Sequence, residues 1–216
     1  MTGADTRRAI AEAAAQEFLL RGYAGTSLSA VAERLGLTKG ALAYHFPTKA
    51  DFASHFIRTV RAATAQADTY AKSEYPTCGA RRLLLYFMVM GRWRATVPCF
   101  AAGMALFTDS ASPTFEADQV IQDWLTLSAE ALETARESDR SPSTLEAAEI
   151  FLVTNLGATF FERHVRLNMP GTQKLRFVRA GLTAAGVSHV DQHADDVLDK
   201  HDGRLPAFDY SRINDY

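Results

Sequence analysis

The chain has little cysteine, no long apolar run and no excess of either charge. Its two cysteines, Cys78 and Cys99, are too few for a disulfide framework and lie in no C-x-x-C pair or His/Cys cluster with metal-ligand spacing. We therefore expect free thiols, a reducing compartment and no metal or other cofactor. The longest apolar run, residues 83–90, is far short of the roughly 20 residues that span a bilayer, and residues 1–21 lack the features of a secretory signal. These absences predict a cytoplasmic protein with no membrane contact.

The composition that remains is typical of a globular protein. The chain has 216 residues, of which 47% are hydrophobic and 22% charged, with 13 Gly and 7 Pro, and this excludes disordered and fibrous classes. A net charge of −2 hides an asymmetry, because residues 1–66 hold eight Lys/Arg against five Asp/Glu while the rest holds 15 against 20. A basic first third on an acidic body indicates an anionic partner at the N-terminal end.

Helical periodicity runs through almost the whole chain, and strand alternation is nearly absent, so we predict an all-α fold. Residues 27–46 read as helix, Gly-containing turn and short helix, with Gly36 ending the first helix. This is the arrangement of a helix-turn-helix, whose second helix lies in the DNA major groove. Leu42 and Phe46 are expected to face inward and Lys39 and Tyr44 outward. The pattern alone also fits a helical hairpin that merely packs.

Residues 8–52 resemble the N-terminal DNA-binding domain of the tetracycline-repressor (TetR) family. The residues that carry the resemblance are Phe18, Gly22-Tyr23, Thr26-Ser27, Leu37 to Gly40, His45-Phe46 and Lys49. The resemblance implies a homodimer that binds a double-stranded DNA operator and a small-molecule effector. It implies a three-helix helix-turn-helix domain over residues 1–47, and a C-terminal helical domain for effector binding and dimerisation over 48–186. The candidate DNA contacts are Thr26, Ser27, Thr38, Lys39, Gly40, Ala43, Tyr44, His45 and Lys49.

One position departs from the family pattern. Ala43 stands where the family usually has a Tyr whose hydroxyl reaches a phosphate, and Tyr44 can take over part of that role. The missing Tyr favours an alternative, a helical interaction protein of the same fold that has lost specific DNA binding. Lys49, in the first turn of a helix, opposes the helix dipole, so we expect its charge to serve a phosphate.

Aromatic and Met side chains at helical spacing are the candidate effector contacts, although the same spacing equally fits an ordinary core. Residues 103–113, Phe115 and the sequence IQDW over 121–124 resemble the γ-butyrolactone receptors of actinomycetes, whose subfamily keeps a Trp at the ligand pocket. That resemblance implies a small, mostly apolar effector such as a butyrolactone or furan-type signal. The candidates are Tyr86, Phe87, Met90, Trp93, Phe100, Met104, Phe107, Phe115, Trp124 and Asn155.

The remaining segments concern assembly and the C-terminus. By family analogy the small and apolar residues of the last two long helices, among them Ala147, Phe151, Gly157 and Phe161, form a four-helix bundle between protomers, while an intrachain core explains part of the same set. Residues 187–216 hold seven acids against three bases, and we expect an irregular, solvated acidic tail rather than a metal site at its histidines.

Asp123, Glu162 and His164 could host acid–base chemistry, but no catalytic motif accompanies them, so we predict no enzyme. The expected function is a repressor released from a palindromic operator by its effector.

Overall fold

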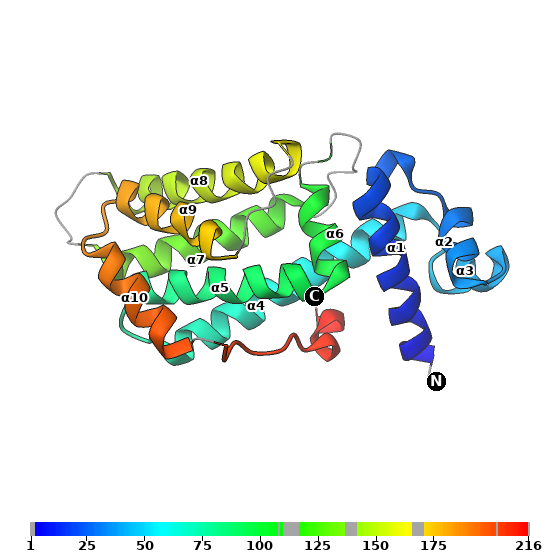
Figure 1. The fold of residues 1–216 in the computed structure, drawn as a ribbon, viewed down its shortest axis with the longest axis horizontal. Helices are drawn as coiled ribbons and strands as arrows, with labels where there is room; N and C mark the ends of the chain where they lie inside the picture. Colours follow the sequence, from blue (N-terminus) through cyan, green and yellow to red (C-terminus); the bar gives the residue numbers. More distant parts are fainter. Residues whose placement is uncertain are drawn as a thin grey trace. The chain divides into compact units, whose positions relative to one another are not determined.

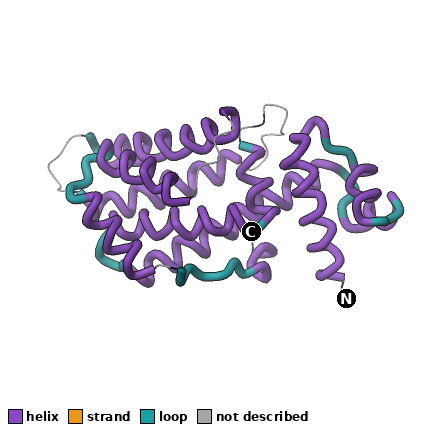
Figure 2. Tube along the Cα trace, viewed as in Figure 1, coloured by secondary structure: helices purple, strands orange, loops and turns teal. Residues whose placement is uncertain are grey.

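A computed structural model describes residues 3–107, 109, 117–136, 142–165, 171–201 and 203–215. All regular structure in these ranges is helical, as the periodicity predicted (Figure 2). None of the helices in the described ranges has both the length and the apolar character that crossing a bilayer requires. In chain order the helices are α1 (Gly3–Gly25), α2 (Leu28–Leu35), α3 (Lys39–His45), α4 (Lys49–Glu74), α5 (Gly79–Thr96), α6 (Pro98–Leu106), α7 (Ala117–Ala135), α8 (Thr144–Val165), α9 (Gly171–Ala184), α10 (Val190–His201) and the 3-10 helix η1 (Tyr210–Asp215) (Figure 1).

The chain divides into two compact units. The first unit comprises Met1–Ala63, Trp93–Val120 and Phe208–Tyr216, and the second comprises Thr64–Arg92 and Ile121–Ala207. Helices α4, α5 and α7 each contribute residues to both units. The functional boundaries expected after residues 47 and 186 stay predictions.

Local signals fix the helix ends of the first unit. Gly22 breaks α1 with φ 70° and ψ 177°, a conformation that glycine adopts without a Cβ clash. Ser27 and Thr38 cap α2 and α3, because each side-chain oxygen accepts a hydrogen bond at 3.2 Å from the backbone N–H three residues on. Gly36, with φ 63°, ends α2 in the left-handed conformation. The helix and turn boundaries predicted over residues 27–46 are therefore confirmed.

An aromatic cluster forms the core of the first unit around the end of α3. The rings of Phe46 and Phe52 stack at 4.2 Å, and those of Phe18 and Phe56 meet edge to face at 5.2 Å. Phe46 follows the last residue of α3 and is fully buried, as predicted, together with Leu42. The short helix α3 is thus held through side chains on one face and at its C-terminal end.

The helices of the second unit lie roughly along one direction, with α10 crossing their end (Figure 1). Helix α8 begins with a capping box, in which the Ser143 backbone N–H and hydroxyl donate to Glu146 Oε2 at 2.8 and 2.7 Å. Helices α8 and α9 pack closely at Gly181, where a Cβ would lie 3.0 Å from the Phe151 ring. This packing buries Phe151 within the chain, so part of the face assigned to a dimer belongs to the intrachain core.

The prediction of an irregular, solvated C-terminal tail is wrong. Residues 190–201 form α10, and its Val190, Ala194 and Val197 are buried. Ion pairs also fasten α10 to α4 and α5, through Lys200 to Glu74 at 2.9 Å and through Asp196 to Arg81. The acidic composition concealed an apolar stripe at i, i+4 and i+7, which is sufficient to dock a helix.

Candidate nucleic-acid interface and effector site

Helix α3 presents a small polar surface opposite its buried face. Tyr44 is 86% exposed, and Lys39 and Gly40 are also exposed, whereas Ala43 and His45 are half-buried. Among the described residues, no side chain beyond its chain neighbours and no backbone outside this helix lies within 4 Å of a Cβ built at Gly40, so Gly40 is open to an approaching ligand. The helix therefore offers a cation, a phenol and accessible backbone along one surface, which are groups that contact phosphates and base edges.

Three predicted contacts also have local structural roles. Thr26 is buried and its hydroxyl donates to the Gly22 carbonyl at 2.8 Å. Ser27 and Thr38 are exposed N-caps whose hydroxyl oxygens accept the backbone hydrogen bonds described above. A hydroxyl that accepts in a cap can still donate its own proton to a phosphate. Contacts of these residues with DNA stay predictions.

Lys49 lies against the end of α1. Its Nζ donates to the Tyr23 carbonyl at 2.8 Å, lies 3.5 Å from the Ala24 carbonyl oxygen and sits 4.4 Å from the centre of the Tyr23 ring. The Tyr23 N–H in turn donates to Asp109 Oδ2 at 2.7 Å. In this arrangement the Lys49 charge stabilises carbonyl groups at the α1–α2 corner, and the phosphate contact expected from its position stays a prediction.

A buried histidine supports α3 from α4. The His55 ring lies edge to face with Phe46 at 5.6 Å, and its Nδ1 is 3.4 Å from an Arg7 guanidinium nitrogen. Burial, together with the charges of Arg7 and Arg58, lowers the pKa of His55 from 6.5 to about 4. The ring is therefore neutral near pH 7 and can accept a hydrogen bond from Arg7. Arg7 also stacks on Phe46 at 4.4 Å, so it is a packing residue as well as a surface cation.

The predicted effector residues fall in both units. Tyr86, Phe87, Met90, Trp124 and Asn155 belong to the second unit, and Trp93, Phe100, Met104 and Phe107 to the first, while Phe115 lies outside the described residues. All nine described side chains are buried or half-buried. Burial agrees with either a core or a site role, so the assignment of these residues to an effector stays a prediction.

Two of the second-unit candidates converge on a residue that sequence reasoning missed. Trp124 Nε1 donates to Thr64 Oγ1 at 2.8 Å, and the Tyr86 hydroxyl donates to the same oxygen at 3.4 Å. All three side chains are buried, and this burial raises the pKa of the Tyr86 hydroxyl, which stays protonated. Thr64 shares one face of α4 with the buried Val60, Ala67 and Ala71, and a single polar side chain on such a face is the signal that could have identified it.

The other polar candidates give no comparable cluster. Asn155 is buried and its Nδ2 donates to the Phe151 carbonyl at 2.8 Å within α8. The side chains of Glu162 and His164 lie outside those that the structure describes. Among the described residues, no three His, Cys, Asp or Glu side chains are grouped so that they could hold a metal ion, and Cys78 and Cys99 are free thiols.

The helix-turn-helix geometry coincides with a family match. The family model described as bacterial regulatory proteins, tetR family, matches residues 10–55, which span most of α1, all of α2 and α3, and the start of α4. This match is confined to the N-terminal part of the chain.

Solved structures extend the likeness to nearly the whole chain. A gamma-butyrolactone receptor (ArpA-like protein) is 20% identical with a TM-score of 0.71, covering 92% of this chain and 100% of that one. The TetR family protein CprB from S. coelicolor A3(2) is 20% identical with a TM-score of 0.67, covering 92% and 98%. TylP, a tetR regulator from Streptomyces fradiae, is 19% identical with a TM-score of 0.60, also covering 92% and 98%. At these identities the likeness shows the fold alone, and no curated protein matches the chain.

Proposed function

We propose that this protein is a homodimeric repressor that binds a palindromic DNA operator and is released from it by a small, mostly apolar effector. The observation that carries the proposal is the exposed surface of α3 within the matched residues, with Tyr44 and Lys39 outward and Leu42 fully buried. A helix held in this way can enter a major groove without losing its packing.

The DNA-binding part is tested by selecting genomic fragments with the purified protein, followed by titration of the enriched site at several salt concentrations. Enrichment of a palindrome that is bound with nanomolar affinity at physiological salt is the expected result. The variant Lys39→Ala should lower the salt slope by about one counterion unit, because it removes an exposed cation from α3. Lys49→Ala separates the two roles of that residue: a lower slope means a phosphate contact, and an unchanged slope with weaker binding means support of the α1–α2 corner.

The alternative, an interaction protein without specific DNA binding, is favoured by Ala43. A half-buried methyl group at this position makes no hydrogen bond to a phosphate. The next residue, Tyr44, supports the DNA-binding proposal instead, since its side chain is exposed and its hydroxyl is available to a phosphate. Failure of every fragment to be enriched above nonspecific DNA would favour the interaction protein.

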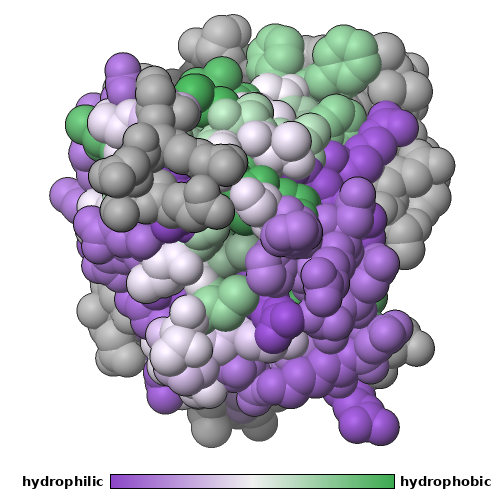
Figure 3. All heavy atoms as spheres, turned by 90° about the vertical axis from the view of Figure 1, so that its left-hand side faces the viewer, coloured by the Kyte–Doolittle hydropathy of each residue, from purple (hydrophilic) through white to green (hydrophobic). Residues whose placement is uncertain are grey.

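The dimer part of the proposal is supported by an apolar stripe on α8. Ile150, Val153, Phe160 and Phe161 are exposed along this helix, with Val153 71% exposed. Figure 3 shows hydrophobic side chains gathered in the upper part of the face it draws, at the height of α8 and α9 in Figure 1. Exposed apolar surface of this kind marks interfaces. Val153→Glu should give a monomer in analytical ultracentrifugation, and the matched control Leu20→Glu on α1 should leave the dimer intact.

The effector part rests on the cluster of Trp124, Tyr86 and Thr64. Two aromatic side chains that direct their polar atoms at one buried hydroxyl combine apolar surface with hydrogen-bonding groups, as small-molecule sites do. The gamma-butyrolactone receptor structure suggests the chemical class. Trp93→Phe leaves Trp124 as the sole tryptophan, so its fluorescence should change on titration with γ-decalactone, and operator affinity should fall at the same concentrations. Binding without any change in operator affinity would refute the coupling.

A further inference from the structure

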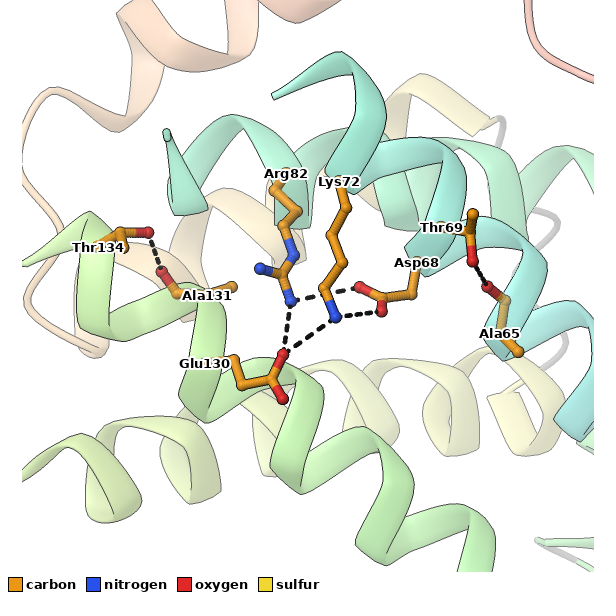
Figure 4. Close-up of polar contacts among 8 residues, drawn as sticks. All are labelled: Ala65, Asp68, Thr69, Lys72, Arg82, Glu130, Ala131 and Thr134. Atoms are coloured by element: carbon orange, nitrogen blue, oxygen red, sulfur yellow. Dashed lines mark hydrogen bonds and ion pairs between the residues drawn. The ribbon is translucent and has the colours of Figure 1, made fainter. Parts of the chain in front are cut away.

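Helix α4 is joined to α5 and α7 by two sets of polar contacts about one helical turn apart. The first set is Thr64 with Tyr86 of α5 and Trp124 of α7, described above. The second set is four charged side chains, Asp68 and Lys72 of α4, Arg82 of α5 and Glu130 of α7, which we name the charged ring (Figure 4). The same three helices are therefore connected twice through polar groups.

The charged ring alternates acid and base without a gap. Arg82 Nη2 lies 3.3 Å from Asp68 Oδ1 and 3.2 Å from Glu130 Oε2. Lys72 Nζ lies 2.7 Å from Asp68 Oδ2 and 3.0 Å from Glu130 Oε2. Each base thus bridges α4 and α7, and Arg82 brings α5 into the same contact.

Burial makes the charged ring sensitive to the loss of a member. The Arg82 side chain is 10% exposed and that of Asp68 17%, so these two charges are largely removed from water. Hydrogen bonding from Lys72 lowers the pKa of the Glu130 carboxyl, which keeps that group ionised. Removing one partner of a buried pair leaves an uncompensated charge, which is much more costly than the loss of a surface pair.

The two helices that α4 faces are fixed to each other beside the charged ring. A Cβ built on Gly79 of α5 would lie 1.7 Å from the Ala131 carbonyl oxygen of α7, so the two backbones are in direct contact there. In contrast, the buried face of α4 in this region consists of Ala67 and Ala71, which project only methyl groups. Such a face forms shallow ridges that restrict sliding weakly. The position of α4 along the α5–α7 pair therefore depends on its polar contacts.

We propose that the charged ring is the positioning element that holds α4 in the register required for operator binding, with Arg82 as its central member. This inference rests on the proposed function above. Three residues separate the end of α3 from the start of α4, and α4 continues without interruption to the charged ring, so a change in its register is carried along one helix toward α3. An effector that displaces Thr64 from Trp124 removes one of the two sets of contacts, and the charged ring is the other.

The test compares a charge-neutral disruption of the ring with a matched disruption elsewhere. In Arg82→Met with Glu130→Gln, the Asp68–Lys72 pair remains intact and no net charge is added. The control is Arg179→Met with Asp191→Asn, because Arg179 pairs with Asp191 at 2.9 Å and with Asp195 at 3.2 Å between α9 and α10, without α4. Both are assayed for amide hydrogen exchange and for affinity to the selected operator without effector, well below their melting temperatures.

The ring variant should show faster exchange in residues 64–74 and about tenfold weaker operator binding, within the range of typical allosteric couplings. In the control variant, neither the exchange rate in residues 64–74 nor the operator affinity should change by more than about twofold. Arg82→Lys, which keeps the charge, should retain most of the operator affinity. If the double variant does not fold, Glu130→Gln alone takes its place in both assays. Unchanged exchange in α4, or operator affinity equal to that of the control, overturns the proposal. If the unaltered protein enriches no DNA, the proposed function fails, and the exchange comparison alone still decides whether the ring positions α4.

Discussion

His55 makes the stability of the helix-turn-helix unit depend on pH in a direction and amount that the structure defines. The side chain is 7% exposed, and burial with the charges of Arg7 and Arg58 lowers its pKa to about 4. In the unfolded chain the pKa of a histidine is about 6.5. Between about pH 6.5 and about pH 4, His55 is therefore protonated in the unfolded state and neutral in the folded state. The contribution of the neutral ring to the free energy of unfolding is fully present above about pH 6.5 and declines as the pH falls toward about 4.

The expected loss follows from the two pKa values. Each unit of pKa difference corresponds to about 1.4 kcal/mol, so the full contribution is about 3 kcal/mol and roughly 2 kcal/mol of it is lost between about pH 7 and about pH 4.5. The structural cause is specific. Protonation removes the acceptor that faces Arg7 at 3.4 Å and adds a second positive charge beside it.

Urea unfolding followed by circular dichroism at both pH values measures this loss. His55→Gln keeps an acceptor for Arg7 and cannot be protonated, so the variant should lose about 2 kcal/mol less than the parent over the same interval. His45→Gln, which removes a half-buried histidine from α3, is the matched control and should behave like the parent. Equal losses in the parent and in His55→Gln would refute the reasoning.

Three further predictions concern single contacts. Gly36→Ala should destabilise the protein by about 1 kcal/mol in thermal unfolding, because the site has φ 63° but nothing within 4 Å of a Cβ, so only backbone strain opposes the change. Gly79→Ala should reduce stability by several kcal/mol through overlap with backbone of α7, and its control in the same helix, Gly91→Ala, should be neutral or slightly stabilising; equal effects would contradict the close contact. Trp124→Phe should cost about 1 to 2 kcal/mol because Thr64 loses a buried donor, whereas Trp124→Phe in a Thr64→Val background should cost less if the hydrogen bond is the cause.

The sequence carried reliable information wherever a boundary depends on neighbouring residues. Ser27, Thr38 and Ser143 cap helices through bonds to atoms three residues away, and Gly22 and Gly36 adopt the positive φ that glycine tolerates. These interactions are local, so residue order suffices to predict them. The inward direction of Leu42 and Phe46 was predictable for the same reason, since helical spacing fixes which side chains share a face.

Contacts between distant residues were beyond the reach of the pattern. Thr64 meets Trp124 across 60 residues, and Lys49 turns toward carbonyl groups 25 and 26 residues before it. Composition misled at α10, because acidic residues dominate the count while three apolar ones fix the packing. In each case the contact depends on which helix packs against the residue. The spacing of residues in a single sequence does not show this.

Helix α3, the proposed recognition helix, depends on this nonlocal packing for its stability. With seven residues α3 is too short to be stable alone in water, because helix nucleation is unfavourable and few bonds repay it. Its order comes from Leu42, from Phe46 stacked on Phe52, and from the His55 and Arg7 side chains that cover Phe46. Protonation of His55 acts on that support rather than on any group that would face DNA. Acid should therefore weaken operator binding more in the parent than in His55→Gln, because it destabilises the packing under α3. The two proteins should keep the same slope against salt, since no phosphate contact depends on His55.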